Sequence, residues 1–270
     1  FRTYTVATEE GRVFNGMLAS ETRTTLELID TEAKRHVVQR AEIEELVASN
    51  KSLMPEGFEK QVTKQDMADL LEFLTQRGRY IPLDLRKAAT IVSTRPMFYG
   101  QSSIERLVFD DWSPKTVEDV PFQLVDPRGD RVANVIMLHS PNGTHPPTMP
   151  KSVSLSVNAP AEAIHFLSGV SGWGAKGPRE NGTVSLIVRL HYRDGATEDH
   201  PLYDGRHFAD YVGTFDVPES KRAFDLGGRQ LRYLKVQPKR AEVIERIELV
   251  KGEDRTAPLV VAITVETPQR

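Results

Sequence analysis

Trp173 is the residue whose type and setting most favour binding of a small ligand. It lies among glycines in the segment Gly169-Val-Ser-Gly-Trp-Gly174. An exposed indole ring can stack on the apolar face of a pyranose, while nearby charged and amide groups hydrogen-bond the hydroxyls. The alternative is that Trp173 folds back and covers the edge of the surrounding sheet. The sequence leaves both interpretations open.

Residues 203–211 concentrate aromatic and charged side chains in what we expect to be a loop. The candidates for binding hydroxyls in this loop are Tyr203, Asp204, Arg206, His207, Asp210 and Tyr211. The same composition is typical of a solvated surface turn, so both interpretations stay open. Arg189 and His191 join the candidates because they alternate with the apolar positions of the predicted strand 184–192 and share its other face.

Met54 is a third residue whose type suggests chemistry. It precedes Pro55, which disfavours a helical conformation for the residue before it, and a predicted helix follows. A methionine thioether is a soft ligand for haem iron and raises its reduction potential. The alternative role is that of a gap-filling side chain in an apolar core.

The composition excludes several kinds of function. The 270 residues include no cysteine, which rules out disulfides, thiolate metal sites and thiol catalysis. The formal net charge is -3 and charges of both signs are interspersed, so no basic block favours nucleic acid as a partner. No apolar run approaches the ~20 residues that cross a bilayer, and we therefore expect no membrane span.

Sequence motifs of catalysis are missing as well. The seven histidines form no His-Glu-x-x-His pattern, and there is no nucleophile elbow, phosphate-binding glycine loop or dinucleotide fingerprint. We therefore expect neither enzyme activity nor a catalytic metal. A structural Ca²⁺ stays open, because Asp110, Asp111 or Asp126 could supply oxygen ligands, although the sequence defines no ligand set.

Two regions of different pattern must position these residues. From residue 1 to 49, short segments of period two alternate with turns, which predicts a small, curved antiparallel sheet. A helix is predicted over residues 63–76, because Thr63 and Asp66 resemble a capping box and apolar residues then recur at helical spacing. We place the end of this first domain, residues 1–78, at Gly78.

Residues 79–270 read as strand after strand, with turns but no helical pattern between them. The clearest predicted strands are 132–138, 152–157, 163–167, 184–192, 231–236, 245–250 and 259–265. Many short strands of this kind indicate an antiparallel sandwich, and we expect a jelly roll. The predicted fold class is thus mainly β: a small antiparallel β segment with one α-helix, followed by a β-sandwich.

The first 78 residues resemble the C-terminal part of the c-type cytochrome domain found in multidomain proteins of the planctomycete and verrucomicrobial type. The likeness is carried by Tyr4-Thr-Val6, Thr8-Glu-Glu-Gly11-Arg-Val-Phe-Asn-Gly16, Arg40-Ala-Glu-Ile43, Ser52-Leu-Met54-Pro-Glu-Gly57 and Asp69-Leu-Leu71-Glu-Phe-Leu74. It implies that Met54 is an axial haem ligand in an intact parent, whose haem c is attached to a Cys-x-x-Cys-His in an upstream cytochrome domain. It implies no cofactor for the fragment itself, which lacks that motif.

Residues 79–270 resemble galactose-binding-like β-sandwiches, among them the carbohydrate-binding modules appended to glycosidases. The likeness is carried by Ile81-Pro-Leu-Asp84-Leu85, Val120-Pro-Phe122, Ala163-Ile-His-Phe166-Leu167, Tyr192-Arg-Asp194-Gly195, His200-Pro-Leu202 and Ala262-Ile-Thr-Val265-Glu266. It implies non-catalytic binding of a polysaccharide or oligosaccharide beside a cytochrome involved in electron transfer. The competing hypothesis is a structural or protein-docking sandwich that binds no sugar. Both interpretations place the protein in the periplasm or outside a bacterial cell.

Overall fold

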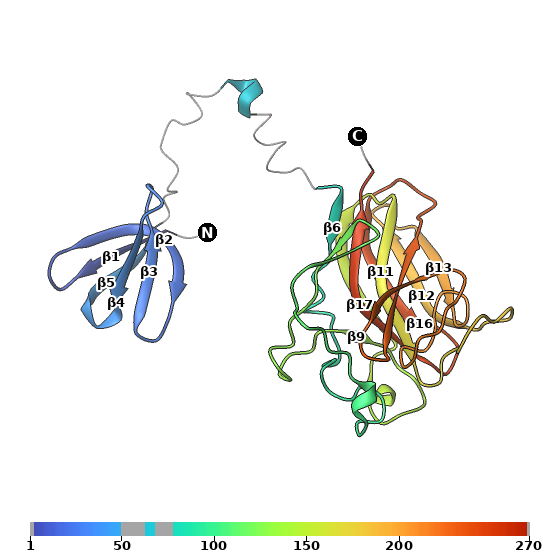
Figure 1. Cartoon of the computed structure of the whole chain (residues 1–270). Coiled ribbons are helices and arrows are strands. Elements are labelled where there is room, and N and C mark those ends of the chain that lie inside the picture. Colours follow the sequence, from blue (N-terminus) through green and yellow to red (C-terminus); the bar gives the residue numbers. More distant parts are fainter. Residues whose placement is uncertain (1–2, 50–62, 68–77, 269–270) are drawn as a thin grey trace. The chain divides into compact units, whose positions relative to one another are not determined.

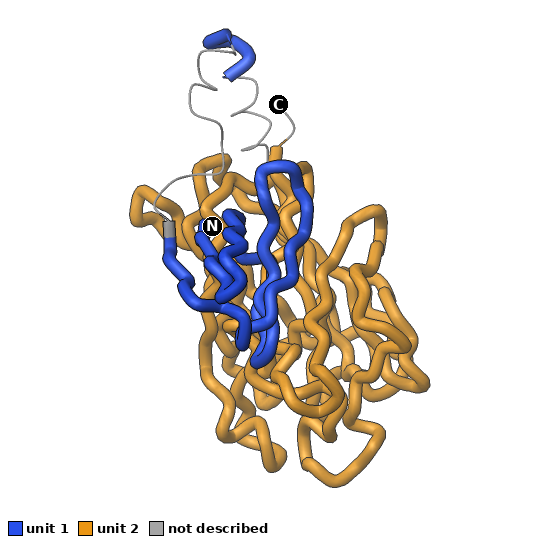
Figure 2. Tube along the Cα trace, turned by 90° about the vertical axis from the view of Figure 1, so that its left-hand side faces the viewer, with its two compact units in different colours: residues 1–76 blue, residues 77–270 orange. Residues whose placement is uncertain are grey.

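The structure is a computed structural model that describes residues 3–49, 63–67 and 78–268. The chain divides into two compact units, residues 1–76 and residues 77–270 (Figure 1, Figure 2). The strands of the described residues pair in antiparallel ladders, which confirms the predicted mainly β class. Among the same residues, no helix is long and apolar enough to span a membrane.

The first unit contains a five-stranded sheet with the order β4-β3-β2-β1-β5. Its strands are β1 (Thr3–Thr8), β2 (Val13–Glu21), β3 (Thr25–Ile29), β4 (Arg35–Gln39) and β5 (Ile43–Ser49), and the short 3-10 helix η1 (Arg40–Glu42) connects β4 to β5. Val6, Leu26, Leu28 and Val38 form the buried core of the unit. The antiparallel sheet predicted for residues 1–49 is therefore confirmed.

A helix begins after Thr63, as the capping pattern predicts. The backbone N–H of Asp66 donates to the Thr63 hydroxyl at 3.0 Å, and the backbone N–H of Thr63 donates to the Asp66 carboxylate at 3.0 Å. This exchange satisfies two of the backbone donors that a helix start leaves unpaired. The rest of the predicted helix, residues 68–76, and the predicted haem ligand Met54 lie outside the described residues.

The second unit holds the remaining described elements. Its strands are β6 (Tyr80–Pro82), β7 (Lys115–Val117), β8 (Val120–Phe122), β9 (Ile136–Met137), β10 (Ser152–Ala159), β11 (Ala163–Ser171), β12 (Val184–Tyr192), β13 (Thr197–Tyr203), β14 (Lys221–Asp225), β15 (Gln230–Val236), β16 (Ile244–Lys251) and β17 (Ala257–Glu266). Two short 3-10 helices are η3 (Ser103–Glu105) and η4 (Pro146–Thr148). The strand predicted over 132–138 is shorter than expected, because its pairing is confined to β9 and to an isolated bridge between Val135 and Ile91.

Two antiparallel sheets of this unit enclose a large apolar core. One has the order β10-β16-β12-β13, and the other has the order β14-β15-β11-β17-β6, with β9 also paired to β17. The alternate residues Leu186, Val188 and Leu190 of β12 enter the core, as the period-two pattern predicts. Ile164 and Phe166 of β11 reach the same core from the other sheet.

The sheet that contains β11 and β17 is covered on its second face as well. The segment between β6 and β10 contributes Leu107, Phe122 and Met137 to a second apolar cluster, which also includes Leu167 of β11 and Leu259 of β17 (Figure 1). Burial on both faces explains why β11 and β17 are buried along their whole length.

One end of this sheet gathers several loops. Because β11 and β17 are antiparallel, the end of β11 at Ser171 pairs with the start of β17 at Ala257. The loop after β11 therefore lies beside the turn before β17. The segment that follows β9 reaches the same place, since the Ser140 hydroxyl donates to the Arg255 carbonyl at 2.7 Å.

Candidate functional site

Trp173 is displayed on the loop that follows β11. Trp173 is 69% exposed, so most of its surface faces solvent. Its backbone has a φ of 68°, a left-handed conformation that is uncommon for a residue with a side chain. Such a conformation persists only where the surroundings hold it.

Tyr99 is the partner of Trp173 at the surface. The indole N–H donates to the Tyr99 hydroxyl across 3.2 Å, and Tyr99 is itself 45% exposed. The Lys176 ammonium lies 5.8 Å from the centroid of the Trp173 ring. We call Trp173 and Tyr99 the aromatic pair. Sequence reasoning missed Tyr99 because it lies far from Trp173 along the chain, in a segment whose only local signal is the run Phe98-Tyr99-Gly100.

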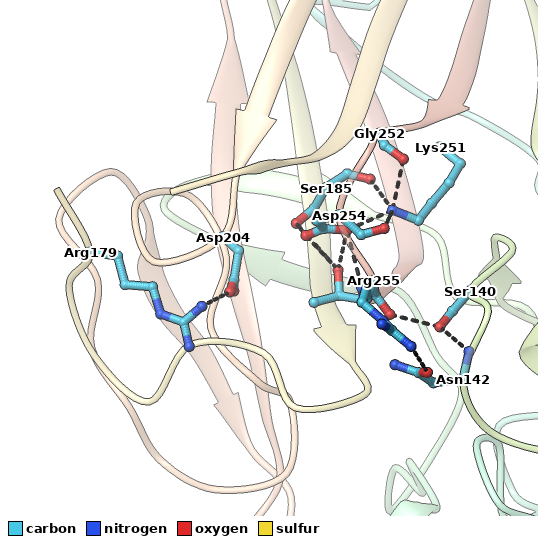
Figure 3. Close-up of polar contacts among 10 residues, drawn as sticks. Ser140, Asn142, Arg179, Ser185, Asp204, Lys251, Gly252, Asp254 and Arg255 are labelled. Carbon is cyan, nitrogen blue, oxygen red and sulfur yellow. Dashed lines mark hydrogen bonds and ion pairs between the residues drawn. The ribbon is translucent and has the colours of Figure 1, made fainter. Parts of the chain in front are cut away.

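Two buried carboxylates hold the backbone of the Trp173 loop. The N–H of Gly174 donates to Asp210 at 2.9 Å, and the N–H of Ala175 donates to Asp204 at 2.8 Å. Arg179 pairs with the second oxygen of Asp204 at 3.0 Å (Figure 3). Both carboxylates are buried, so they position the loop and do not present a free surface to a sugar. The prediction that Asp204 and Asp210 bind hydroxyls directly is corrected accordingly.

The pKa values of Asp204 and Asp210 are both raised above the ordinary value of an aspartate. Burial raises the pKa of Asp204 and of Asp210, because a charged carboxylate loses its hydration inside the protein. The backbone N–H groups of Ala175 and Val212 partly offset this rise for Asp204 and Asp210 respectively.

A third buried carboxylate holds the Tyr99 segment. One oxygen of Glu105 accepts the backbone N–H groups of Phe98, Tyr99 and Gly100 at 2.9, 2.8 and 3.1 Å. Hydrogen bonds to an ionised acceptor are stronger than neutral ones. The Glu105 carbonyl in turn accepts the hydroxyl of Tyr211 at 2.6 Å. The Glu105 carboxylate thus holds the backbone of Tyr99 in place.

Tyr211 belongs to the core and not to the ligand surface. Its side chain is fully buried in the apolar cluster that covers the larger sheet. Burial raises the pKa of its hydroxyl well above the ordinary value. The prediction of Tyr211 as a sugar contact is therefore corrected: it links the 203–211 segment to the Tyr99 segment.

Phe98 is the packing centre on which these loops meet. It is buried, and its ring meets that of Tyr99 edge-on with centroids 4.8 Å apart. A Cβ placed on Gly172 would come within 2.7 Å of the Phe98 ring, and one on Gly143 within 2.8 Å. Both glycines have a positive φ, so each position needs glycine for conformation and for space.

A buried ammonium supports the turn before β17. The Lys251 Nζ contacts the Asp254 carboxylate at 2.6 Å and the carbonyl oxygens of Gly252 and Asp254 at 3.0 and 2.9 Å (Figure 3). Asp254 also accepts the Ser185 hydroxyl. Because Lys251 and Asp254 are almost fully covered, we assign them to holding this turn and its exposed residue Arg255.

Tyr203, Arg206 and His207 form a separate group around Glu219. Arg206 and His207 both pair with the Glu219 carboxylate, the latter at 2.9 Å, and the Arg206 guanidinium lies 5.4 Å from the Tyr203 ring centroid. Burial lowers the pKa of His207. These side chains bond to one another, and among the described residues their ion pairs and ring contacts stay within this group.

Arg189 and His191 lie on the outer face of the smaller sheet. Arg189 makes two hydrogen bonds to Asp199 at 2.7 and 2.9 Å, and His191 contacts Glu248 at 2.8 Å. The structure therefore does not bring them together with Trp173. Their face carries paired charges across neighbouring strands.

Two of the three carboxylates considered for calcium, Asp111 and Asp126, bond to neighbours close in the chain, while the third, Asp110, lies beside Asp111 in the sequence. Asp111 accepts from Lys115 at 2.7 Å, which with Ser113 lowers the pKa of Asp111 to about 2, and Asp126 accepts the Arg128 backbone N–H at 2.7 Å. Within the ranges that the structure describes, no group of three or more His, Cys, Asp or Glu side chains could hold a metal ion.

Comparison with known proteins supplies no family. No family model, no curated protein and no solved structure matches this chain. The site is therefore interpreted from its own geometry.

Proposed function

We propose that residues 77–270 form a non-catalytic carbohydrate-binding module, a sandwich of the jelly-roll, galactose-binding-like class, which binds sugar rings on the aromatic pair. The observation that carries the proposal is the exposed Trp173 ring on a loop whose backbone is held by Asp204 and Asp210. A fixed and exposed aromatic ring supports ligand binding, because a surface that is already ordered loses little conformational entropy when the ligand binds.

The chemistry of the aromatic pair suits a pyranose. The faces of Trp173 and Tyr99 offer the apolar contact, and the Tyr99 hydroxyl and Lys176 ammonium offer hydrogen bonds at its margin. Because Glu105 and the two aspartates already order the loops, binding costs little further conformational entropy. We expect an open surface of this kind to bind weakly at each site. The overall affinity rises when one polymer binds several copies of the protein.

The second candidate is a protein-docking surface, and one observation favours it. Ile104 and Val108 are also exposed and follow Tyr99 closely in the chain. Exposed apolar side chains in one segment are typical of protein interfaces. In that case the aromatic pair would contact a protein, and sugars would not compete.

A glycan array on the whole chain tests the proposal. We expect binding by the wild type, loss of binding in Trp173→Ala, and retention in Arg189→Ala, whose side chain lies on the outer face of the smaller sheet. Melting temperatures of all variants check that they fold. No binding by the folded wild type would contradict the proposal and favour the docking surface.

The proposed context is a bacterial periplasmic or secreted redox protein, in which a c-type haem belongs to a longer polypeptide. Met54 lies outside the described residues, and the chain has no cysteine to attach a haem. The test is a longer polypeptide that carries Cys-x-x-Cys-His upstream. Met54→Ala should lower its reduction potential, whereas an unchanged potential would remove Met54 from the ligand role.

A further inference from the structure

Two exposed cations, Lys176 and Arg255, lie on the loops around the aromatic pair, and among the described residues neither forms an ion pair with a carboxylate. The Lys176 ammonium lies 5.8 Å from the Trp173 ring centroid. The Arg255 guanidinium donates only to the amide oxygen of Asn142, at 3.0 Å. The Arg255 carbonyl lies 3.8 Å from the position of a Cβ on Gly172, the residue before Trp173. Both cations therefore belong to the loops that present the aromatic pair.

The three carboxylates that hold these loops face inward, whereas Glu180 and Glu253 are exposed. Glu105, Asp204 and Asp210 are buried and are occupied by backbone N–H groups. Arg179 neutralises Asp204 in addition. Beside the Trp173 ring, a ligand therefore meets the Lys176 ammonium, and Coulomb attraction at contact distance outweighs repulsion from the three supporting carboxylates, which lie deeper.

The outer face of the smaller sheet shows the opposite arrangement. There Arg189 is matched by Asp199, and His191 by Glu248, all at the surface. A charge that already has a partner gains little from a ligand anion, because it must first give up that partner. Among the described residues Lys176 forms no ion pair at contact distance, and its ammonium acts on the buried Asp210 carboxyl only by lowering the pKa of that group from further away.

We propose that the aromatic pair binds an anionic glycan, in which a sugar ring stacks on Trp173 and its acidic group pairs with Lys176 and Arg255. This inference rests on the proposed function and names its ligand class. The recognised feature is an anion carried on a pyranose. Two kinds of polymer supply it, one with uronate carboxylates and one with sulfate esters.

Calorimetric titration with matched polymers tests the inference. The probes are polygalacturonate against a neutral galactan, and a sulfated galactan against the same polymer after desulfation. The proteins are the wild type, Lys176→Gln, Arg255→Gln, Trp173→Ala and, as the control, Arg189→Gln. Each titration is run at low and at high ionic strength, because contacts between exposed charges weaken with salt.

We expect the wild type to bind at least one anionic polymer about tenfold more tightly than its neutral counterpart, which is the effect of about one good charge contact. Lys176→Gln should remove most of this preference and keep the weaker neutral binding, whereas Arg189→Gln should change nothing. The pair in which the anionic polymer binds more tightly than its neutral counterpart identifies the recognised group as uronate or as sulfate.

Three results would overturn the inference, and they separate it from the proposed function. Equal binding of charged and neutral polymers that still depends on Trp173 would refute the anionic class and leave carbohydrate binding intact. Anionic binding that survives Trp173→Ala would show general polyelectrolyte attraction and refute both. Absence of binding to every polymer would also refute both.

Discussion

The sequence makes both the Trp173 loop and the outer face of the smaller sheet candidates for binding, and the structure arranges their polar side chains in opposite ways. On the sheet, Arg189 and His191 lie on the outer face and pair with the carboxylates of Asp199 and Glu248. Asp204 and Asp210, in contrast, lie inside the protein and accept backbone N–H groups of the Trp173 loop. The faces of the Trp173 ring are thereby left exposed.

The contrast teaches that a binding surface depends on the side chains that hold it as much as on those that it displays. Surface ion pairs contribute little to stability and occupy the groups that a ligand would need. Buried carboxylates that accept backbone N–H groups fix a loop and occupy none of the exposed groups. The predictions that follow compare removal of the buried supports with removal of surface pairs.

Glu105→Ala should destabilise the second unit by about 3 kcal/mol or more, because the N–H groups of Phe98, Tyr99 and Gly100 lose their common acceptor. Chemical denaturation measures the change in the free energy of unfolding. Asp199→Ala, which breaks a surface pair, is the matched control. Equal effects of the two substitutions would contradict the difference between support and surface pair.

Gly172→Ala should cost about 2 kcal/mol, since the new methyl group meets the Phe98 ring and the backbone has a φ of 87°. Gly195→Ala is the matched control: its φ is also 87°, but no atom lies within 4 Å of its Cβ position. The difference between the two variants isolates the packing on Phe98. If both variants unfold at the same denaturant concentration, the Phe98 contact contributes nothing.

The pH dependence of stability should report on Asp204 and Asp210. A raised pKa in the folded state means that their contribution is fully present below the unfolded pKa of about 4 and is lost as the pH rises through the folded pKa. Relative to the Asp204→Asn/Asp210→Asn variant, the wild type should lose stability over that interval. Melting temperatures measured from acidic to neutral pH give the comparison, and parallel curves would show that neither pKa is raised.

Arg189→Ala should change the free energy of unfolding by about 0.5 kcal/mol or less, because the Arg189–Asp199 pair is solvent-screened. Its melting temperature should fall slightly at low ionic strength and not at all at high salt. A fall of several degrees in melting temperature at high salt would contradict this expectation, because it would show that the pair stabilises the protein as much as Glu105 does.

Local patterns predicted much of the fold. The alternation along β12 places Leu186 and Val188 in the core, and the Asp194-Gly195 pair forms the turn before β13, where Asp194 accepts the N–H of Ala196 at 3.0 Å. Thr63 and Asp66 cap a helix as expected. These features depend on residues a few positions apart, which is the range over which sequence pattern is informative.

The supports of the candidate site could not be predicted in the same way. Asp210 and Tyr211 look like surface residues because their segment is polar, yet tertiary contacts bury both. Tyr99 and Glu105 join the site through contacts to Trp173 and Tyr211, which lie far away in the chain. No local period marks such contacts, since they arise only when the sheet brings its loops together.

Titration of a glycan followed by tryptophan fluorescence tests the central claim most directly, because the chain has only two tryptophans and the other, Trp112, packs against Phe109. The account predicts that ligand changes the emission of Trp173 in the Trp112→Phe protein. It also predicts that Trp173→Ala abolishes binding while Tyr203→Ala retains it. Binding that survives Trp173→Ala and is lost in Tyr203→Ala would contradict the account.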